Sequence, residues 1–409
     1  IMQRRAEKTS RSLLPDRFRG RRGELTSLRD FARTGTLSGS DSSAPRHLAG
    51  VPPDGVPALL VTGIGGSGKS ALIEQFRRNL QRADWVVLAH FDLDRAALRL
   101  GDQVALVQEL LRQIGYALPD LDAPIAELRG QIRDAMALSQ APLDLEAGAS
   151  AILGAILGLN ELLAASGMND RVLVIIIDTF EEALQLGPQR VAQIAEWLRT
   201  LRDHGGFASL RVILAGRSAE TLTQMPQDLA VLGVIELDEL GTDAGRAKLG
   251  DMFKRLEIPH RDLIPDLIAE FGSNPLVIEI LAVYCRDKPR DEITGLMGGS
   301  DANARTKLGA EMRQRFLYTR ILDRLSDPAL KPLACPGLVL RRIEPAQISG
   351  LLAGPCGLPP MTPAQEQALF ERLATHLWLV RRVAPGPGGG PEMLEHLPDL
   401  RRLMLPQIL

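Results

Sequence analysis

A glycine-rich loop that ends in a lysine and a serine lies between an apolar run and a helical pattern. The loop Gly63–Ser70 reads GIGGSGKS, which fits the spacing of a P-loop in the strand–loop–helix context that gives this motif its meaning. Glycines let the backbone curl so that successive N–H groups face phosphate oxygens, and the following helix adds the positive end of its dipole. The pattern therefore predicts a phosphate-binding site rather than an ordinary glycine-rich turn.

Two side chains at the end of this loop have chemistry of their own. Lys69 is predicted to reach the β- and γ-phosphates. Ser70 is predicted to place its hydroxyl on Mg²⁺, a hard cation that takes few ligands from protein in nucleotide sites. The residues assigned to bound ATP or ADP in this stretch are Gly63, Ile64, Gly65, Gly66, Ser67, Gly68, Lys69, Ser70 and Ala71.

Acidic residues follow a second apolar run. Asp178 ends the strand pattern RVLVIIID at 171–178, at the place where P-loop enzymes keep a carboxylate for the Mg²⁺ shell. Hydrolysis also needs a group that orients and activates water, and Glu181 and Glu182 follow at the same edge of the predicted sheet. Either glutamate fits this role; the alternative is that both are exposed acids at a helix start, where the helix dipole favours them.

Two further residues complete the list of candidates. Arg217 ends the next strand pattern, where a guanidinium can contact a γ-phosphate with bidentate geometry; the alternative is an ordinary surface arginine. His396 lies far along the chain, and an isolated histidine is usually structural. The histidines and cysteines show no metal-ligand spacing. The catalytic candidates are therefore Lys69, Asp178, Glu181, Glu182 and Arg217, and the metal candidates are Ser70 and Asp178.

These side chains require a sheet whose strands end at one edge. Strands are predicted from Ala58 to Thr62 and over 85–94, 171–178, 210–218 and 231–240. Helical patterns separate them, most clearly at 103–115, 150–165 and 187–201. This alternation predicts an α/β fold, a P-loop NTPase with a parallel sheet covered by helices on both faces.

Beyond Gly241 the strand signal fades. Helical patterns at about 242–256, 261–271 and 275–286 predict a small helical lid, and a helix near 303–325 begins another part of the chain. There Thr362-Pro363-Ala364-Gln365 combines an N-cap, a proline at N1 and a capping-box glutamine. The helices and the hairpin around PGPGGGP outline a winged helix. The predicted organisation is a basic linker at 1–15, a P-loop nucleotide-binding domain at 16–240 with a mobile loop at 35–57, a helical lid at 241–299 and a winged-helix domain at 300–409.

Composition sets limits on the class of protein. The 409 residues carry a net charge of −2 with 45% hydrophobic residues, which is ordinary for a soluble protein. Three cysteines without pairing or metal spacing favour a reducing cytoplasm. The apolar stretch 149–165 is interrupted by Asn160 and Glu161 and predicts no membrane span. Because the chain begins with Ile1 rather than methionine, we expect it to belong to a longer polypeptide with further domains.

At these residues the chain resembles the STAND class of signal-transduction ATPases, which includes NB-ARC and NACHT modules. GIGGSGKS is similar to the family's Walker A motif, and DTFEE from Asp178 resembles the NACHT pattern of spaced acids. The sequence AGR ending at Arg217 resembles the sensor-1 motif. Phe18-x-Gly20-Arg21-x-x-Glu24-Leu25 resembles the N-terminal motif that lies near adenine, with Arg22 where the family usually has an acid. This resemblance implies that Phe18 and Arg21 contact the nucleotide.

Two more motifs extend the resemblance over about 16–409. Gly272-Ser273-Asn274-Pro275 is similar to the lid's glycine-x-proline element, one residue longer here, which implies that Pro275 lies beside the adenine. The sequence EHLPDLR from Glu395 resembles the winged-helix motif whose histidine, here His396, holds the β-phosphate in a closed ADP-bound state. The order of these motifs is what points to STAND proteins.

Two functions from different classes follow. The first is a nucleotide-controlled switch that hydrolyses ATP slowly, forms a homo-oligomer with ATP and acts through effector or sensor domains in flanking sequence. The second is a nucleic-acid-remodelling ATPase of the origin-recognition or transposition-helper type. Its support comes from paired arginines in the last part of the chain, whereas the near-neutral charge and the lack of interleaved aromatic and basic residues argue against a dominant DNA surface. These arginines are Arg341, Arg342, Arg381, Arg382, Arg401 and Arg402.

Overall fold

The computed structural model of the chain divides into two compact units. The first contains residues 1–63 and 69–237, and the second contains residues 64–68 and 238–409. The structure describes residues 18–37, 46–47, 54–93, 103–138, 145–216, 225–226, 228–286, 288–297, 318, 329–334, 337–375, 379–383, 392–396 and 401.

The first unit is built on a six-stranded sheet in the order β1-β6-β2-β5-β4-β3. Neighbours from β6 to β3 run parallel, and β1 joins β6 antiparallel. The strands are β1 (Arg46–His47), β2 (Val56–Thr62), β3 (Val86–Asp92), β4 (Val172–Asp178), β5 (Ser209–Ala215) and β6 (Leu229–Glu236). The parallel sheet predicted from the alternation of strands and helices is confirmed, whereas β1 falls in a segment whose composition predicted only a loop.

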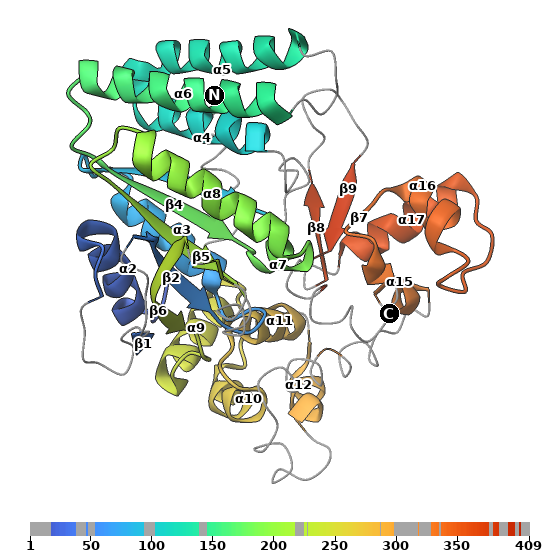
Figure 1. The fold of residues 1–409 in the computed structure, drawn as a ribbon. Helices are drawn as coiled ribbons and strands as arrows, with labels where there is room; N and C mark the ends of the chain where they lie inside the picture. Colours follow the sequence, from blue (N-terminus) through green and yellow to red (C-terminus); the bar gives the residue numbers. More distant parts are fainter. Residues whose placement is uncertain are drawn as a thin grey trace. The chain divides into compact units, whose positions relative to one another are not determined.

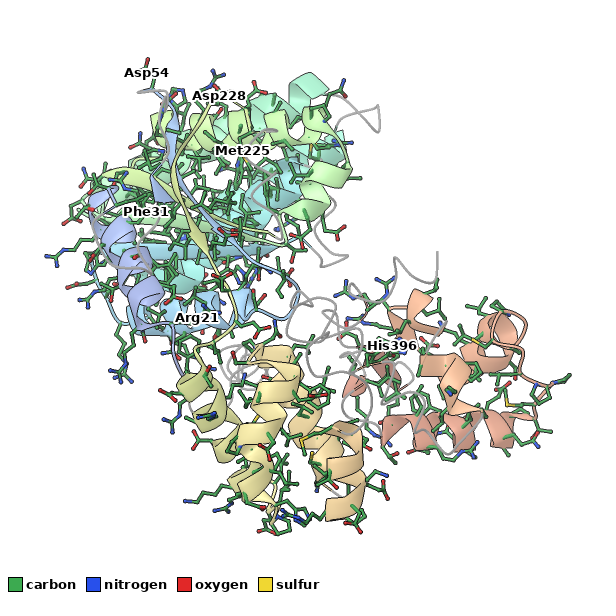
Figure 2. All side chains as sticks on the ribbon, turned by 90° about the horizontal axis from the view of Figure 1, so that it is seen from below. Arg21, Phe31, Asp54, Met225, Asp228 and His396 are labelled. Carbon is green, nitrogen blue, oxygen red and sulfur yellow. The ribbon has the colours of Figure 1, made fainter. Side chains whose placement is uncertain are left out.

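Helices cover both faces of this sheet (Figure 1). One face packs against α2 (Arg22–Thr34) and α3 (Lys69–Leu80), and Phe31 of α2 is fully buried there (Figure 2). The other face packs against the remaining long helices, with α5 lying on α4 and α6. These helices are α4 (Gln103–Ala117), α5 (Asp122–Leu138), α6 (Leu145–Ala165) and α8 (Pro188–His204), with the short α7 (Glu181–Gln185) between β4 and α8. Because the sheet is covered on both sides, its strands are apolar almost throughout.

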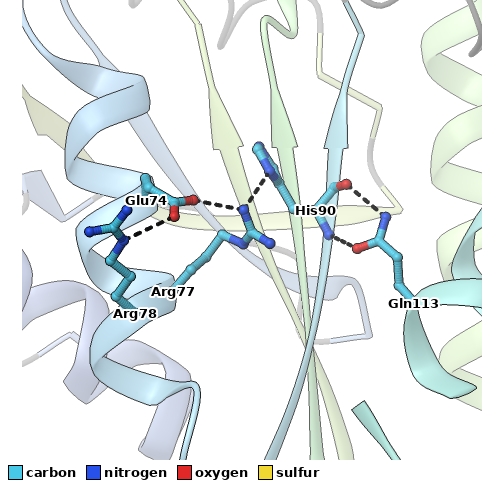
Figure 3. Close-up of polar contacts among 5 residues, drawn as sticks. All are labelled: Glu74, Arg77, Arg78, His90 and Gln113. Carbon is cyan, nitrogen blue, oxygen red and sulfur yellow. Dashed lines mark hydrogen bonds and ion pairs between the residues drawn. The ribbon is translucent and has the colours of Figure 1, made fainter. Parts of the chain in front are cut away.

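A side chain covers part of the exposed edge of β3, the last strand of the sheet. Gln113 of α4 accepts a hydrogen bond from the His90 backbone N–H at 2.7 Å and donates one to the His90 carbonyl at 2.8 Å (Figure 3). The amide thus satisfies the backbone groups that a further strand would take. The His90 side chain itself contacts α3, where Arg77 approaches Nδ1 at 3.3 Å and pairs with Glu74. Such covering of an edge strand opposes pairing with another chain.

One helix of the described chain is long and apolar enough to cross a membrane by length and composition. It is the stretch Gly148–Ala165 of α6, a third of which is buried. Its inward side chains, such as Ile156 and Leu159, belong to the core cluster beneath the sheet. The sequence predicted no membrane span here, whereas this helix meets the length and composition of one.

The second unit begins with helices that the sequence predicted as a lid. They are α9 (Thr242–Arg255), α10 (Ile264–Phe271), α11 (Pro275–Cys285) and α12 (Arg290–Met297). The predicted strand 231–240 ends early, at Glu236, because Leu240 already donates its backbone N–H to Ser273 of this unit. Asn274 caps α11 by accepting the Leu276 N–H at 3.0 Å.

The last part of the second unit combines short helices with a three-stranded antiparallel sheet in the order β7-β9-β8. Its elements are α15 (Leu330–Ala334), β7 (Arg342–Ile343), α16 (Pro345–Gln347), a π-helical turn (Ile348–Leu352), α17 (Pro363–Ala374), β8 (Val380–Val383) and β9 (Met393–His396). The predicted capping box is present, since the Thr362 N–H donates to Gln365 Oε1 at 2.8 Å. Of the helix predicted near 303–325 the structure describes only Tyr318, and the PGPGGGP turn lies outside the described residues.

Candidate nucleotide-binding site

The phosphate loop is held between β2 and α3. Lys69 is the first residue of α3, and its Nζ donates to the Gly63 carbonyl at 2.7 Å. The lysine charge therefore lies back over the start of the loop. Within the loop the Ser67 N–H donates to the Ile64 carbonyl at 3.2 Å. Gly66 and Gly68 have φ values of 73° and 95°, in the left-handed region that a side chain rarely enters.

Asp178 lies at the end of β4, as the sequence predicted, and is only 5% exposed. Burial raises the pKa of its carboxyl to about 6, because the charged form loses hydration. A hydrogen bond with the Ser70 side chain lowers this pKa, Asp92 raises it, and Lys69 lowers it. The first unit therefore brings together Lys69, Ser70 and Asp178, which are the lysine, the hydroxyl and the carboxylate of the predicted site.

The oxygens of Ser70 and Asp178 fit a hard divalent cation. Carboxylate and hydroxyl oxygens are the protein ligands that Mg²⁺ takes beside water and phosphate. The Asp178 carboxylate is buried and bonded to the Ser70 side chain, so the two ligands already lie at one place. Among the described residues no group of three or more His, Cys, Asp or Glu side chains is arranged to hold a metal ion by itself.

The two glutamates after Asp178 have different surroundings. Both carboxylate oxygens of Glu181 are shielded from solvent, and a methyl group placed on Gly216 would lie 3.5 Å from Glu181 Oε2. The Glu181 carboxylate therefore faces the end of β5. Glu182 is half-buried on the same short helix, and its N–H donates to the Thr179 carbonyl. Arg217, predicted beside this position, lies outside the described residues.

Asp92 is a residue that the sequence reasoning missed. It ends β3 as Asp178 ends β4, and the two are paired in register on adjacent parallel strands. Its Oδ1 accepts a hydrogen bond from the Thr179 hydroxyl at 3.3 Å. The signal in the sequence was an acid at the end of an apolar strand, the same signal that identified Asp178.

The N-terminal motif is part of the first unit. Phe18 packs against the core beneath α2. Arg21 has a φ of 60° in the turn before α2, and its guanidinium pairs with Glu24 at 3.0 Å. In this arrangement Arg21 fixes the turn that carries the motif.

The middle of the phosphate loop belongs to the second unit. The Leu276 N–H donates to the Gly66 carbonyl at 3.3 Å, and a methyl group on Gly66 would lie 2.4 Å from Leu276 Cβ. A methyl group placed on Gly68 would lie 3.6 Å from Pro275 Cγ. The predicted lid residue Pro275 is therefore beside the phosphate loop.

His396 is fully buried at the end of β9 (Figure 2). Its Nδ1 lies 2.8 Å from the Leu340 carbonyl, so Nδ1 carries the proton of a neutral ring. Nε2 makes no hydrogen bond of ordinary geometry to a described residue. Burial lowers the pKa of His396 to about 4; the Leu340 carbonyl opposes this shift, the Arg401 charge adds to it, and the nearby Leu333 carbonyl favours the charged ring.

Comparison with known proteins gives a resemblance for most of the first unit. Residues 46–228 match the family model described as AAA ATPase domain. The matched residues include the phosphate loop, both strand-end aspartates and the two glutamates.

A curated relative is similar over more of the chain. A probable ATPase of Lysobacter enzymogenes is 23% identical over 376 residues, which cover 79% of this chain and 34% of that protein. The chain thus spans about a third of the length of the curated relative it matches.

Similar solved structures include the ORC2 protein of Aeropyrum pernix in ADPNP and ADP complexes, with 16% identity, a TM-score of 0.42 and coverage of 97% of this chain and 95% of that one. They also include the Cdc6p protein of Pyrobaculum aerophilum, with 12% identity, a TM-score of 0.41 and coverage of 97% of this chain and 96% of that one. A STAND protein with a tetratricopeptide repeat sensor from Pyrococcus horikoshii has 13% identity and a TM-score of 0.43, and the match covers 95% of this chain and 42% of that one.

Proposed function

We propose that this chain is a nucleotide-controlled switch that hydrolyses ATP slowly and responds to ADP and ATP with different conformations. The observation that carries the proposal is the packing of the phosphate loop on the lid. Gly66 accepts the Leu276 N–H, and Gly68 lies beside Pro275. Because the same loop residues are assigned to phosphate, a change at the phosphates alters the surroundings of the lid.

The chemistry of the site follows from its oxygens and its lysine. Ser70 and Asp178 hold Mg²⁺ in this proposal, and Lys69 leaves the Gly63 carbonyl for the β- and γ-phosphates. Bound Mg²⁺ would neutralise charge on the phosphate oxygens. Glu181 orients and activates water in this proposal, because its carboxylate oxygens are shielded from solvent and Oε2 faces Gly216 at the end of β5. These roles divide metal binding, phosphate binding and water activation among separate side chains.

His396 is proposed to hold the β-phosphate of ADP in the closed state. Nδ1 donates to the Leu340 carbonyl, which leaves a lone pair on Nε2, and Nε2 makes no hydrogen bond of ordinary geometry to a described residue although the Leu333 carbonyl lies nearby. A phosphate oxygen accepts hydrogen bonds, and an unprotonated Nε2 also only accepts them. His396 must therefore take up a proton at Nε2 when phosphate binds. A phosphate dianion favours that proton, since an opposite charge raises the pKa of a histidine.

Simple energetics support a switch of this kind. A ligand shifts a conformational equilibrium only through different affinities for the two states. With ADP at about 100 times its Kd, binding confined to the closed form stabilises it by about 2.7 kcal/mol. A charge-assisted hydrogen bond from His396 is worth about 1.5–3 kcal/mol, so its loss is enough to release the closed state.

The test is release of a fluorescent ADP analogue in a stopped-flow instrument. We expect His396→Ala to release the analogue faster than the wild type and to form larger assemblies with ATP. The matched control is His260→Ala, which replaces a half-buried histidine between α9 and α10 and should behave as the wild type. A His396 variant with a lower melting temperature and a wild-type release rate would show that His396 is only a packed residue, and the proposed role would be wrong.

Partners follow from the same proposal. The ATP-bound form assembles with further copies of this chain, and the output comes from effector or sensor domains in flanking sequence. The chain spans 34% of the length of its Lysobacter enzymogenes relative, which leaves room for such domains in proteins of that kind.

The alternative function, remodelling of nucleic acid, depends on the arginines near the C-terminus. Arg341 and Arg342 lie 3.2 and 3.5 Å from the buried Glu395 carboxylate. Arg382 pairs with Glu371 and Glu392. Arg401 donates to the Leu338 and Val339 carbonyls at 2.8 Å, whereas the side chains of Arg381 and Arg402 lie outside the described residues. Arginines bonded within the protein are less available to phosphates, and this supports the switch over the alternative.

A further inference from the structure

The turn that follows β4 holds a branched residue in left-handed backbone. Thr179 has a φ of 62°, which is a strained conformation for a β-branched side chain. It stands between Asp178, assigned to the metal, and Glu181, assigned to water. Such a conformation persists only where the surrounding contacts hold it.

Several hydrogen bonds hold this turn. The Thr179 N–H donates to Asp178 Oδ1 at 2.9 Å, and its carbonyl accepts the Glu182 N–H at 3.0 Å. The Phe180 N–H donates to the Ala215 carbonyl at 2.8 Å, which ties the turn to β5. The Thr179 hydroxyl donates to Asp92 Oδ1 at 3.3 Å, which ties the turn to β3. The turn is thus bonded to the strand on each side of β4.

The hydrogen bond to Asp92 comes from a buried residue. Thr179 is 5% exposed, so water competes little for its hydroxyl. Asp92 is in register with Asp178, and the Leu93 N–H continues the contact of the two strands by donating to the Asp178 carbonyl at 3.1 Å. The position of Asp92 is therefore fixed by the sheet itself.

Movement of Thr179 would change the direction of the residues after it. Glu181 is two residues further on, and its Oε2 faces Gly216 at the end of β5. A small displacement of a catalytic group costs a large factor in rate, because the reacting atoms must meet within a narrow range of distance. The hydroxyl bond to Asp92 therefore bears on the position of Glu181.

We propose that Asp92 is a positioning residue, which accepts the Thr179 hydroxyl, holds the strained turn and so fixes Glu181 at the carboxyl edge of the sheet. The inference rests on the proposed role of Glu181 as the group that activates water. What the position needs is an acceptor oxygen at Oδ1, so an asparagine there keeps the contact and an alanine removes it. In the same way, serine at 179 keeps the hydroxyl and valine removes it.

The experiment compares ATP hydrolysis in Asp92→Ala, Asp92→Asn, Thr179→Val and Thr179→Ser. We expect Asp92→Ala and Thr179→Val each to lower kcat by about tenfold or more with KM for ATP nearly unchanged. Asp92→Asn and Thr179→Ser should keep most of the wild-type rate. The double variant Asp92→Ala with Thr179→Val should be no slower than the worse single variant, since both remove one contact.

Hydrogen exchange of the peptide over 178–184 gives a readout besides activity. Its amides should exchange faster in Asp92→Ala and Thr179→Val and at the wild-type rate in Asp92→Asn. Asp84→Ala, an exposed aspartate before β3, is the matched control and should change neither measurement.

Three results separate the possible failures. If Asp92→Asn is as slow as Asp92→Ala, the carboxylate charge is what matters and the positioning role is overturned. If Thr179→Val hydrolyses ATP and exchanges like the wild type, the contact has no effect and the inference is also wrong. If the exchange pattern is as expected but Glu181→Gln hydrolyses ATP normally, the turn is held as described and only the proposed role of Glu181 fails.

Discussion

Glu181 and Glu182 are neighbours in sequence with different environments in the fold. Both side chains are half-buried, and both carboxylate oxygens of Glu181 are shielded from solvent, with Oε2 facing Gly216 at the end of β5. A general base must be held at a fixed place near the water it activates. The surroundings of Glu181 meet this requirement better.

We therefore expect Glu181→Gln to bind ATP with nearly wild-type affinity and to hydrolyse it at least about a hundredfold more slowly, as loss of a general base usually costs. Single-turnover hydrolysis and a calorimetric titration of ATP measure the two properties. Glu182→Gln is the control and should retain turnover. Loss of turnover in the Glu182 variant alone would reverse the assignment.

His396 makes the stability of the second unit depend on pH. The pKa of the buried ring is about 4 against a usual 6.5, so between these values the unfolded chain binds a proton that the folded chain does not. The contribution of His396 to the free energy of unfolding is complete above pH 6.5 and is lost as the pH falls towards 4. The difference between the two pKa values corresponds to about 3 kcal/mol.

Hydrogen exchange of the peptide that contains β9 measures this effect. Lowering the pH from 7 to 5, after correction for the intrinsic exchange rate, should increase opening in the wild type. His396→Gln keeps a donor for the Leu340 carbonyl and cannot be protonated, so its opening should change less over the same range. Equal pH dependence in both proteins would assign the effect to another group.

At the scale of elements, the phosphate loop and helix α11 are joined at Gly66. A methyl group at this position would lie 2.4 Å from Leu276 Cβ and 3.1 Å from Asn274 Oδ1. The glycine is therefore needed for two reasons, the left-handed φ of 73° and the close approach of the lid. The first reason was predicted from the motif, and the second was not.

Gly66→Ala is expected to displace the start of α11 and to increase hydrogen exchange in the peptide over 274–280. The matched control is Gly167→Ala, because Gly167 has a φ of 65° and nothing within 4 Å of the added methyl group. Both variants carry the backbone strain, and only the first meets the lid. Unchanged exchange over 274–280 in Gly66→Ala would show that the contact does not hold the lid.

At the scale of the whole molecule, the two proposed functions differ in their response to salt. A protein that neutralises several DNA phosphates with lysine and arginine loses affinity steeply as salt rises, because bound counterions are released. In the described part of the second unit, Arg341, Arg342, Arg382 and Arg401 are bonded to carboxylates or carbonyls of the same unit. The switch proposal therefore predicts weak binding to duplex DNA.

A titration of duplex-DNA binding between 50 and 200 mM salt, with the protein in its ADP and ATP forms, checks this prediction. We expect a dissociation constant no tighter than ordinary non-specific binding, about 10⁻⁴–10⁻⁶ M. Charge reversal by Arg382→Glu should then change little. Tight binding with a steep salt dependence, lost in Arg382→Glu, would favour remodelling of nucleic acid.

The sequence determined the elements that local pattern controls. The apolar runs that became β2, β3, β4 and β5, the helices between them and the capping box before α17 follow from the period of apolar residues and from the chemistry of single turns. The P-loop and the strand-end Asp178 were also predictable, since their meaning lies in short motifs placed after strands.

Tertiary structure decided which of these residues meet. Asp92 and Thr179 are far apart in sequence and join only because β3 and β4 pair in register. Gly66 meets Leu276 only because the lid packs on the phosphate loop. The burial that lowers the pKa of His396 comes from residues of other elements. Such contacts depend on strand order and on the packing of distant segments, and a single sequence read by local period and spacing contains neither.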